Sequence, residues 1–129
     1  MSDHKRAIFP EGGPRPVGPY SPVVVSGDIV FVSGHVGFDP TTGDIVGETF
    51  EAQAHQTFQN LARALEAAGC DFSHVVKTTA FVTRASDFAA FNTIYREYFT
   101  EPYPARSTVV ANLVVDGLLV EVEVIARRP

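Results

Sequence analysis

Arg106 is the side chain in this sequence that most needs a partner. It stands in the run Tyr103-Pro104-Ala105-Arg106-Ser107-Thr108, at the start of an expected buried strand, where an unpaired guanidinium carries a large desolvation cost. An anion must therefore lie nearby. It could be a carboxylate of the same sheet in a structural salt bridge, or a ligand carboxylate gripped through both oxygens by the planar guanidinium. The sequence leaves both interpretations open.

Two carboxylates alternate with valines near the C-terminal end of the sequence. Glu121 and Glu123 are two residues apart in a β-branched run, so they share one face of a strand. That spacing is not the geometry of a glycosidase acid and base, which come from separate elements. Each carboxylate can be an ion-pair partner, an exposed sheet residue or a catalytic group.

Tyr20 and the Ser33-Gly34 pair are further candidates for a binding site. Tyr20 lies between Pro19 and Pro22, whose rings stiffen the backbone, so it fits either a gate over a pocket or a packed loop aromatic. Gly34 ends an expected strand, where a missing side chain lets a ligand or another backbone approach, or simply forms a bulge. His35 follows directly and is typical of a packing or turn contact.

Several other chemistries are disfavoured. Cys70 stands alone, which excludes an intramolecular disulfide and a multi-cysteine zinc site, and it reads as a small buried side chain. Lys77 has no neighbour that would lower its pKa for Schiff-base chemistry. No glycine-rich phosphate loop is present, and a net charge of −5 disfavours nucleic acid as a partner. No metal site is expected, because the four histidines lack ligand spacing: His4, His35, His55 and His74.

The elements that must position these residues follow from local patterns. The β-rich runs 23–25 and 29–33 flank a Ser-Gly-Asp turn and predict a hairpin. A turn at 39–43 leads into a short strand expected at 45–46. Apolar residues at alternating four- and three-residue steps predict a first helix, with Thr49 as its cap and Gly69 as its stop. The members of that stripe are Ala54, Phe58, Leu61, Leu65 and Ala68.

The second half of the chain predicts strand, helix and two further strands. Residues 75–82 form the strand, and Ser86-Asp87 offers N-cap chemistry for a second helix that Pro102 ends. Residues 105–111 and 118–126 form the closing strands. The result is one α+β domain over residues 1–129, with a mixed β-sheet and both helices packed on one sheet face. The other face alternates apolar residues with the two glutamates and predicts self-association.

The N-terminal residues 1–13 reach proline and glycine before any long apolar stretch, so no secretory signal is expected. No segment approaches the ~20 apolar residues of a membrane span. We therefore expect a soluble, cytoplasmic protein without a membrane partner.

Four segments of the sequence resemble the reactive intermediate deaminases, the Rid or YjgF-like family. The resemblance runs in matching order and spacing from about Pro14 to Arg127. The segments are Val17-Gly18-Pro19-Tyr20-Ser21; Val32-Ser33-Gly34-His35 with Asp39-Pro40-Thr41-Thr42-Gly43; residues 75–82; and Pro104-Ala105-Arg106-Ser107 with residues 120–126.

The resemblance implies a chorismate-mutase-like fold and a homotrimer whose sheets line a central barrel, with pockets between subunits. By position, Arg106 would bind the substrate carboxylate, Glu121 would hold or activate the attacking water, and Tyr20 would close the pocket. The backbone near Ser33-Gly34 and Ser107-Thr108 would line the same cleft. His35 stands where the family commonly has Gln, Thr108 where some members have Cys, and the loop before Arg106 is shorter than in some relatives.

The reaction that the resemblance implies is cofactor-free hydrolysis of a 2-imino or 2-enamino acid, such as 2-iminobutanoate or 2-aminoacrylate, to a 2-oxo acid and ammonia. Three other functions stay open: a trimeric metabolite-binding module without turnover, a chaperone-like module, and an endoribonuclease or translation inhibitor. The acidic charge balance disfavours the last of these.

Overall fold

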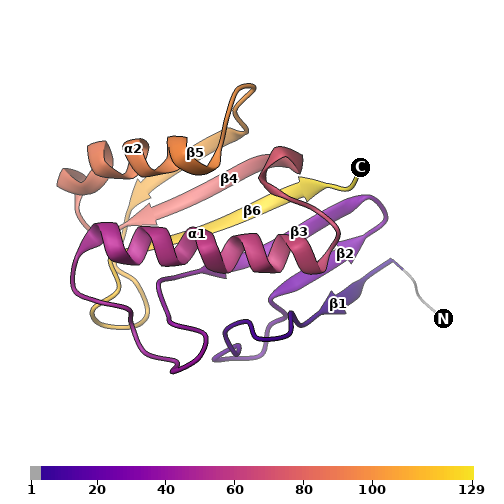
Figure 1. Ribbon diagram of the computed structural model, residues 1–129, viewed down its shortest axis with the longest axis horizontal. Coiled ribbons are helices and arrows are strands. Elements are labelled where there is room, and N and C mark those ends of the chain that lie inside the picture. Colours follow the sequence, from indigo (N-terminus) through magenta and orange to yellow (C-terminus); the bar gives the residue numbers. More distant parts are fainter. Residues whose placement is uncertain (1–3) are drawn as a thin grey trace.

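A mixed six-stranded sheet with two long helices on one face forms the body of the molecule (Figure 1). The structure, a computed structural model, describes residues 4–129. The strands lie in the order β1-β2-β3-β6-β4-β5, which confirms the α+β class. Their bounds are β1 Arg6–Ile8, β2 Val23–Ser26, β3 Ile29–His35, β4 Val75–Val82, β5 Ala105–Val110 and β6 Val120–Arg127; the helices are α1 Phe50–Ala67 and α2 Phe88–Tyr98.

The expected hairpin is confirmed as β2 and β3. The two strands are antiparallel, and the turn between them contains Gly27 at φ +60°, a left-handed conformation that glycine adopts without steric cost. Strand β1, which the sequence did not predict, adds an outer edge by pairing antiparallel with β2. The strand expected at 45–46 is wrong, because Ile45 forms only an isolated bridge with Phe38.

Helix α1 follows its predicted signals closely. The Thr49 hydroxyl accepts a hydrogen bond from the Ala52 N–H at 3.2 Å, and Gly69 stops the helix at φ +78°. All five residues of the predicted apolar stripe are buried. The helix therefore packs the face that its sequence periodicity indicates.

The start of helix α2 differs from the sequence expectation. A 3₁₀ turn, Ala85–Asp87, precedes the helix. Its last residue, Asp87, is the N-cap of α2, but the Asp87 side chain makes no hydrogen bond to the helix N-terminus. The Asp87 carboxylate instead accepts from the Arg84 Nε at 2.8 Å. Phe91, Tyr95 and Phe99 are buried, whereas Phe88 at the first turn is exposed.

The two closing strands are separated in space by β4. Strand β5 runs parallel to β4 and forms one sheet edge, while β6 lies antiparallel between β3 and β4. This places Arg106 at the edge of the sheet and Glu121 near its centre.

The helices bury one sheet face and leave the other open. On β6, Val120, Val122 and Val124 are buried beneath the helices, whereas Glu121 and Glu123 alternate onto the opposite face. Phe31, in register with the partly exposed Ile125, is 44% exposed. None of the helices within residues 4–129 is long and apolar enough to span a membrane.

Candidate functional site

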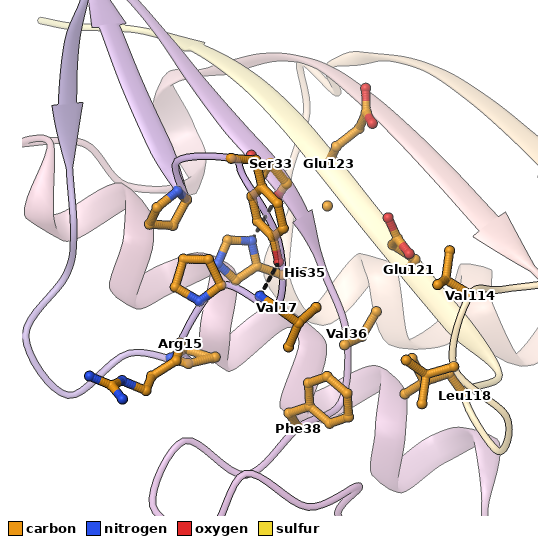
Figure 2. Close-up of a pocket in the computed structure, with 16 residues that line it drawn as sticks. Arg15, Val17, Ser33, His35, Val36, Phe38, Val114, Leu118, Glu121 and Glu123 are labelled. Carbon is orange, nitrogen blue, oxygen red and sulfur yellow. Dashed lines mark hydrogen bonds between the residues drawn. The ribbon is translucent and has the colours of Figure 1, made fainter.

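A cavity of about 490 Å³ opens beside β3 and β6. Figure 2 shows polar side chains of β3 and β6, among them Ser33, Glu121 and Glu123, together with apolar side chains such as Val17, Phe38 and Leu118. The proline-rich segment 14–22 lies on one side, and the loop between β5 and β6 on the other. The lining residues are Pro14, Arg15, Pro16, Val17, Tyr20, Pro22, Ser33, Gly34, His35, Val36, Phe38, Val114, Val115, Leu118, Glu121 and Glu123.

Gly34 makes room for the Glu121 side chain. The register of β3 against β6 shifts between Val32 and His35, so Gly34 lies in a strand irregularity. A Cβ on Gly34 would collide with Glu121 Oε2 and would lie 2.8 Å from Glu121 Cδ. Gly34 therefore lies at a strand irregularity, and the group that approaches it is a side-chain carboxylate, where the sequence had suggested a ligand, another backbone or a simple bulge.

Glu121 is a half-buried carboxylate with a perturbed titration. Burial raises its pKa above the ordinary 4.5, and the charge of Glu123 raises it further. The two carboxylates lie in the same cavity, and neither forms a salt bridge within residues 4–129. A carboxyl group with a raised pKa keeps its proton to higher pH than an exposed glutamate does, and its carboxylate form is a stronger base.

Ser33 fastens the proline-rich segment to β3. Its hydroxyl donates to the Ser21 carbonyl at 2.6 Å, and its N–H donates to the Pro22 carbonyl at 3.0 Å. Tyr20 folds back over the segment and accepts a hydrogen bond from the Val17 N–H at 3.3 Å. Tyr20 is 46% exposed, and its N–H donates to the Gly18 carbonyl at 2.9 Å.

His35 is buried at the edge of the same cavity. Its Nδ1 lies 2.7 Å from the Ser33 carbonyl, and a carbonyl only accepts, so Nδ1 carries the proton. Burial lowers the His35 pKa, and this hydrogen bond opposes the change in part. A neutral imidazole that supports the backbone of Ser33 agrees with the packing or turn contact expected from the sequence.

Two polar side chains of α1, not identified from the sequence, hold the cavity wall in place. Asn60 Nδ2 donates to the carbonyls of Val36 and Phe38, each at 2.9 Å. Gln53 Nε2 donates to the carbonyls of Gly47 and Gly117 at 2.9 Å. Both side chains are buried. The sequence does contain a signal for them, since both are polar residues on the apolar face of a predicted helix. A buried polar side chain must find its hydrogen-bond partners within the protein.

Arg106 lies in a second, smaller cavity of about 280 Å³. Its Nη2 donates to Asn92 Oδ1 at 2.8 Å. The guanidinium carbon lies 4.8 Å from the ring centroid of Tyr95 and 5.5 Å from that of Phe91, close enough for cation–π attraction. The cavity is lined by Asn92, Tyr95, Arg96, Tyr103, Pro104 and Arg106.

Within one copy of the chain, Arg106 has no carboxylate partner. No salt bridge joins it to any residue in the described range 4–129, so a structural ion pair with a sheet carboxylate of the same chain is wrong. Arg106 is in register with Thr78, which is buried beneath α2 and contacts Tyr95. It therefore lies on the helix-covered face, whereas Glu121 lies on the open face.

The predicted site residues are thus divided between the two cavities, and two of them lie outside both. The larger cavity brings together Tyr20, Ser33, Gly34 and Glu121, whereas Arg106 lines the smaller one. Ser107 and Thr108 continue β5 and line neither cavity. The Thr108 hydroxyl oxygen is buried and has no hydrogen-bond partner within residues 4–129.

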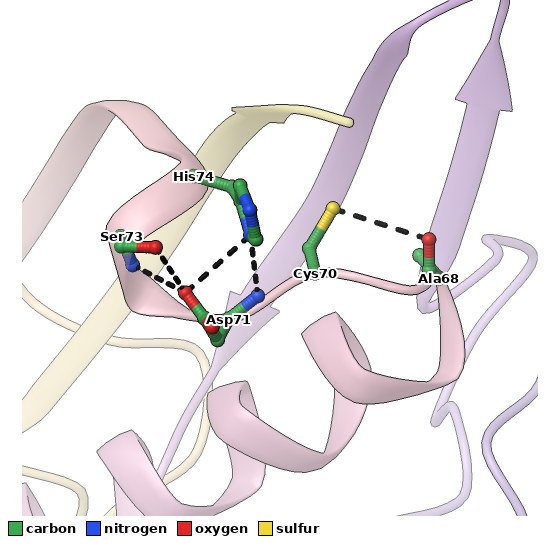
Figure 3. Close-up of polar contacts among 5 residues, drawn as sticks. All are labelled: Ala68, Cys70, Asp71, Ser73 and His74. Atoms are coloured by element: carbon green, nitrogen blue, oxygen red, sulfur yellow. Dashed lines mark hydrogen bonds and ion pairs between the residues drawn. The ribbon is translucent and has the colours of Figure 1, made fainter. Parts of the chain in front are cut away.

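Cys70 lies outside both cavities, in the turn after α1 (Figure 3). Its thiol contacts the Ala68 carbonyl at 3.9 Å, and burial raises its pKa. The adjacent Asp71 and His74 form a reciprocal capping box around a 3₁₀ turn. The small buried side chain expected from the sequence is confirmed. The described part of the chain holds no group of three or more His, Cys, Asp or Glu side chains suited to a metal ion.

Residues 11–128 match the model of the endoribonuclease L-PSP family, which covers most of the chain. The chain belongs to this family. The Rid or YjgF-like resemblance of the sequence is thereby confirmed.

Individual members of this family carry different names. The chain is 39% identical over 124 residues to a RutC family protein of Pyrococcus horikoshii, covering 96% of this chain and 98% of that protein. It is 36% identical over 122 residues to the human 2-iminobutanoate/2-iminopropanoate deaminase, and the match covers 95% of this chain and 89% of the human protein. The crystal structure of E. coli TdcF with bound serine superposes with a TM-score of 0.88 at 35% identity, covering 97% and 100%.

Proposed function

We propose that this protein hydrolyses 2-imino and 2-enamino acids to 2-oxo acids and ammonia. The observation that carries the proposal is Arg106, a guanidinium oriented by Asn92 and three aromatic rings but left without a carboxylate. A receptor of this kind suits the carboxylate of a small substrate. The human relative named as a 2-iminobutanoate/2-iminopropanoate deaminase supports the same chemistry.

The complete site would form between two copies of the chain. Arg106 and Glu121 lie on opposite faces of one sheet, so a single small substrate cannot contact both within one copy. The open face carries the partly exposed Phe31 and Ile125, which a second copy would cover. We propose a homotrimer in which the smaller cavity of one copy meets the larger cavity of the next.

In this site Arg106 would bind the substrate carboxylate and would hold the imine carbon next to Glu121 of the adjacent copy. The Glu121 carboxylate would accept a proton from water as the water oxygen bonds to the imine carbon. The C=N π electrons move to nitrogen, which takes the proton that Glu121 has accepted, and a tetrahedral carbinolamine results. Glu121 would then accept the hydroxyl proton of the carbinolamine and deliver it to the amino nitrogen, so that the C–N bond breaks, ammonia leaves and the C=O bond of the 2-oxo acid forms. Burial and the charge of Glu123 raise the pKa of Glu121, which makes its carboxylate a stronger base than that of an exposed glutamate.

The remaining residues would organise this cavity. Gly34 leaves space for the Glu121 carboxylate, Ser33 fixes the proline-rich segment, and Tyr20 would close the mouth over bound substrate. Correct placement can contribute several kcal/mol and a general base about 10²–10⁴-fold in rate. Such modest machinery suffices because these imines also hydrolyse without a catalyst, and no cofactor is required.

A coupled assay tests the proposal. A threonine or serine dehydratase supplies the imine, and semicarbazide traps whatever has not been hydrolysed. Addition of this protein should lower semicarbazone formation in proportion to its concentration. Unchanged trapping at concentrations comparable to that of the dehydratase would overturn the deaminase proposal.

A binding module without turnover is the second candidate, because the TdcF relative was crystallised with serine. This alternative keeps the composite cavity but assigns Glu121 no base chemistry. Calorimetric binding of small amino or oxo acids together with unchanged semicarbazone formation would favour it.

A further inference from the structure

The smaller cavity contains a second guanidinium. Arg96 lines it together with Arg106, and none of the lining residues is acidic. Arg96 follows Asn92 by four residues on α2, so the two side chains lie on the same helix face, one turn apart. Asn92 holds Arg106 from this face, which places Arg96 beside the same anion receptor.

Arg96 has no other evident task. It is exposed, and it forms no salt bridge or side-chain hydrogen bond with any residue in the range 4–129. Its neighbour Glu97 lies close to His55 instead. The two guanidinium groups line a cavity of about 280 Å³ that has no acidic lining residue, so they repel each other. A ligand with two negative groups would relieve that repulsion.

The larger cavity has the opposite character. Glu121 and Glu123 line it, and the Arg15 side chain points away from its centre in Figure 2. A substrate side chain that ends in a carboxylate would be repelled there and attracted toward Arg96. The two cavities therefore separate an acidic half from a basic half.

We infer that the preferred substrates are 2-imino dicarboxylic acids. This inference rests on the proposed function and specifies its substrate class. Arg106 binds the carboxylate beside the imine carbon, and Arg96 binds the carboxylate at the end of the side chain. Arg106 is fixed by Asn92 and the aromatic rings, whereas Arg96 has a long, exposed side chain, so the pair accommodates substrate side chains that differ by one methylene.

Equilibrium binding of two 2-oxo acids tests this assignment without any turnover. 2-Oxoglutarate and 2-oxopentanoate have equal chain lengths, but only the first ends in a carboxylate. Calorimetry should show 2-oxoglutarate binding about tenfold more tightly, as expected for one added charge-assisted contact. Arg96→Gln should remove this preference. Arg6→Gln, the same charge change on the opposite edge strand β1, should retain it.

Equal affinity of the wild-type protein for both acids, or a preference that persists in Arg96→Gln, would overturn the inference. Parallel kinetics with the corresponding imines, generated by an amino-acid oxidase, separate it from the proposed function. If the protein accelerates hydrolysis of both imines equally, only the role of Arg96 is contradicted, and the deaminase activity stands. No acceleration of either imine contradicts the deaminase activity, and the affinity ratio still decides the assignment of Arg96.

Discussion

At the scale of single residues, the surroundings of Arg106 distinguish a ligand receptor from a structural ion pair. A buried guanidinium paired with a carboxylate would leave an uncompensated charge when truncated, at a cost of about 3–5 kcal/mol. Arg106 instead lies over aromatic rings and donates a hydrogen bond to the neutral side chain of Asn92, which orients it. Removing it strands no carboxylate within the chain, so the main loss should be in substrate binding.

We therefore predict that Arg106→Ala abolishes imine hydrolysis and lowers the free energy of unfolding by only about 1–2 kcal/mol. Arg106→Lys should lower kcat/KM by about 10–100-fold, because lysine keeps the charge but loses the planar two-point grip. Semicarbazone trapping and thermal melting measure the two effects. Full activity in Arg106→Lys would show that charge alone suffices, and activity in Arg106→Ala would remove Arg106 from the site.

Glu121 and Glu123 predict a specific pH dependence. A base acts only when it is deprotonated, so activity should fall as the pH is lowered through the pKa of Glu121, which burial and Glu123 raise above 4.5. Glu123→Gln removes the neighbouring charge and should move this acidic limb of kcat/KM to lower pH. Glu66→Gln, a change at an exposed position on α1, serves as the control. A limb that stays in place in Glu123→Gln would contradict the coupling.

At the scale of elements, two glycines next to the cavity have different functions. A Cβ at Gly34 meets the flexible end of the Glu121 side chain, whereas a Cβ at Gly37 lies 2.9 Å from both the Cα and the carbonyl oxygen of Gln53 in α1. The first contact can be relieved by moving a side chain. The second requires the helix backbone to shift.

Gly34→Ala should therefore displace the Glu121 carboxylate and lower kcat by about tenfold or more, with little change in Tm. Gly37→Ala should lower Tm clearly, because overpacking against a backbone costs about 1–3 kcal/mol. Melting curves and imine kinetics on both variants provide the comparison. A Gly34→Ala variant that melts well below wild type and keeps its specific activity would contradict the assigned role of Gly34.

Local signals predicted most elements, and non-local ones account for the differences. The Thr49 cap, the Gly69 stop and the hairpin turn at Gly27 each act within a few residues, so the sequence reveals them. Strand β1 exists because β2 provides an edge to pair with, and Asp87 bonds Arg84 in place of the helix N-terminus. Such choices depend on partners that periodicity does not identify.

The candidate site shows the same division. Its residue types and motifs were evident in the sequence, but the separation of Arg106 from Glu121 depends on sheet order. Strand β5 lies parallel to β4 at the edge and presents Arg106 to the helix face, whereas β6 presents Glu121 to the open face. Asn60 and Gln53 were missed because most of their bonding partners, such as the carbonyls of Val36 and Gly117, are far away in the sequence.

At the scale of the whole molecule, the two cavities are halves of one proposed site. Each half lacks a component that the other half supplies: the larger cavity has the carboxylates, and the smaller one has the guanidinium free of a carboxylate. Assembly would bring them together and cover the open sheet face. Catalysis then becomes a property of neighbouring copies, which can be tested by mixing defective copies.

Complementation between Arg106→Ala and Glu121→Ala tests this claim most directly. Each homo-oligomer should be inactive in semicarbazone trapping. Co-expression should yield mixed assemblies in which about a quarter of the sites combine an intact Arg106 from one copy with an intact Glu121 from its neighbour. The account predicts that activity returns to about that fraction of wild type. Mixed assemblies that form but remain inactive would contradict it.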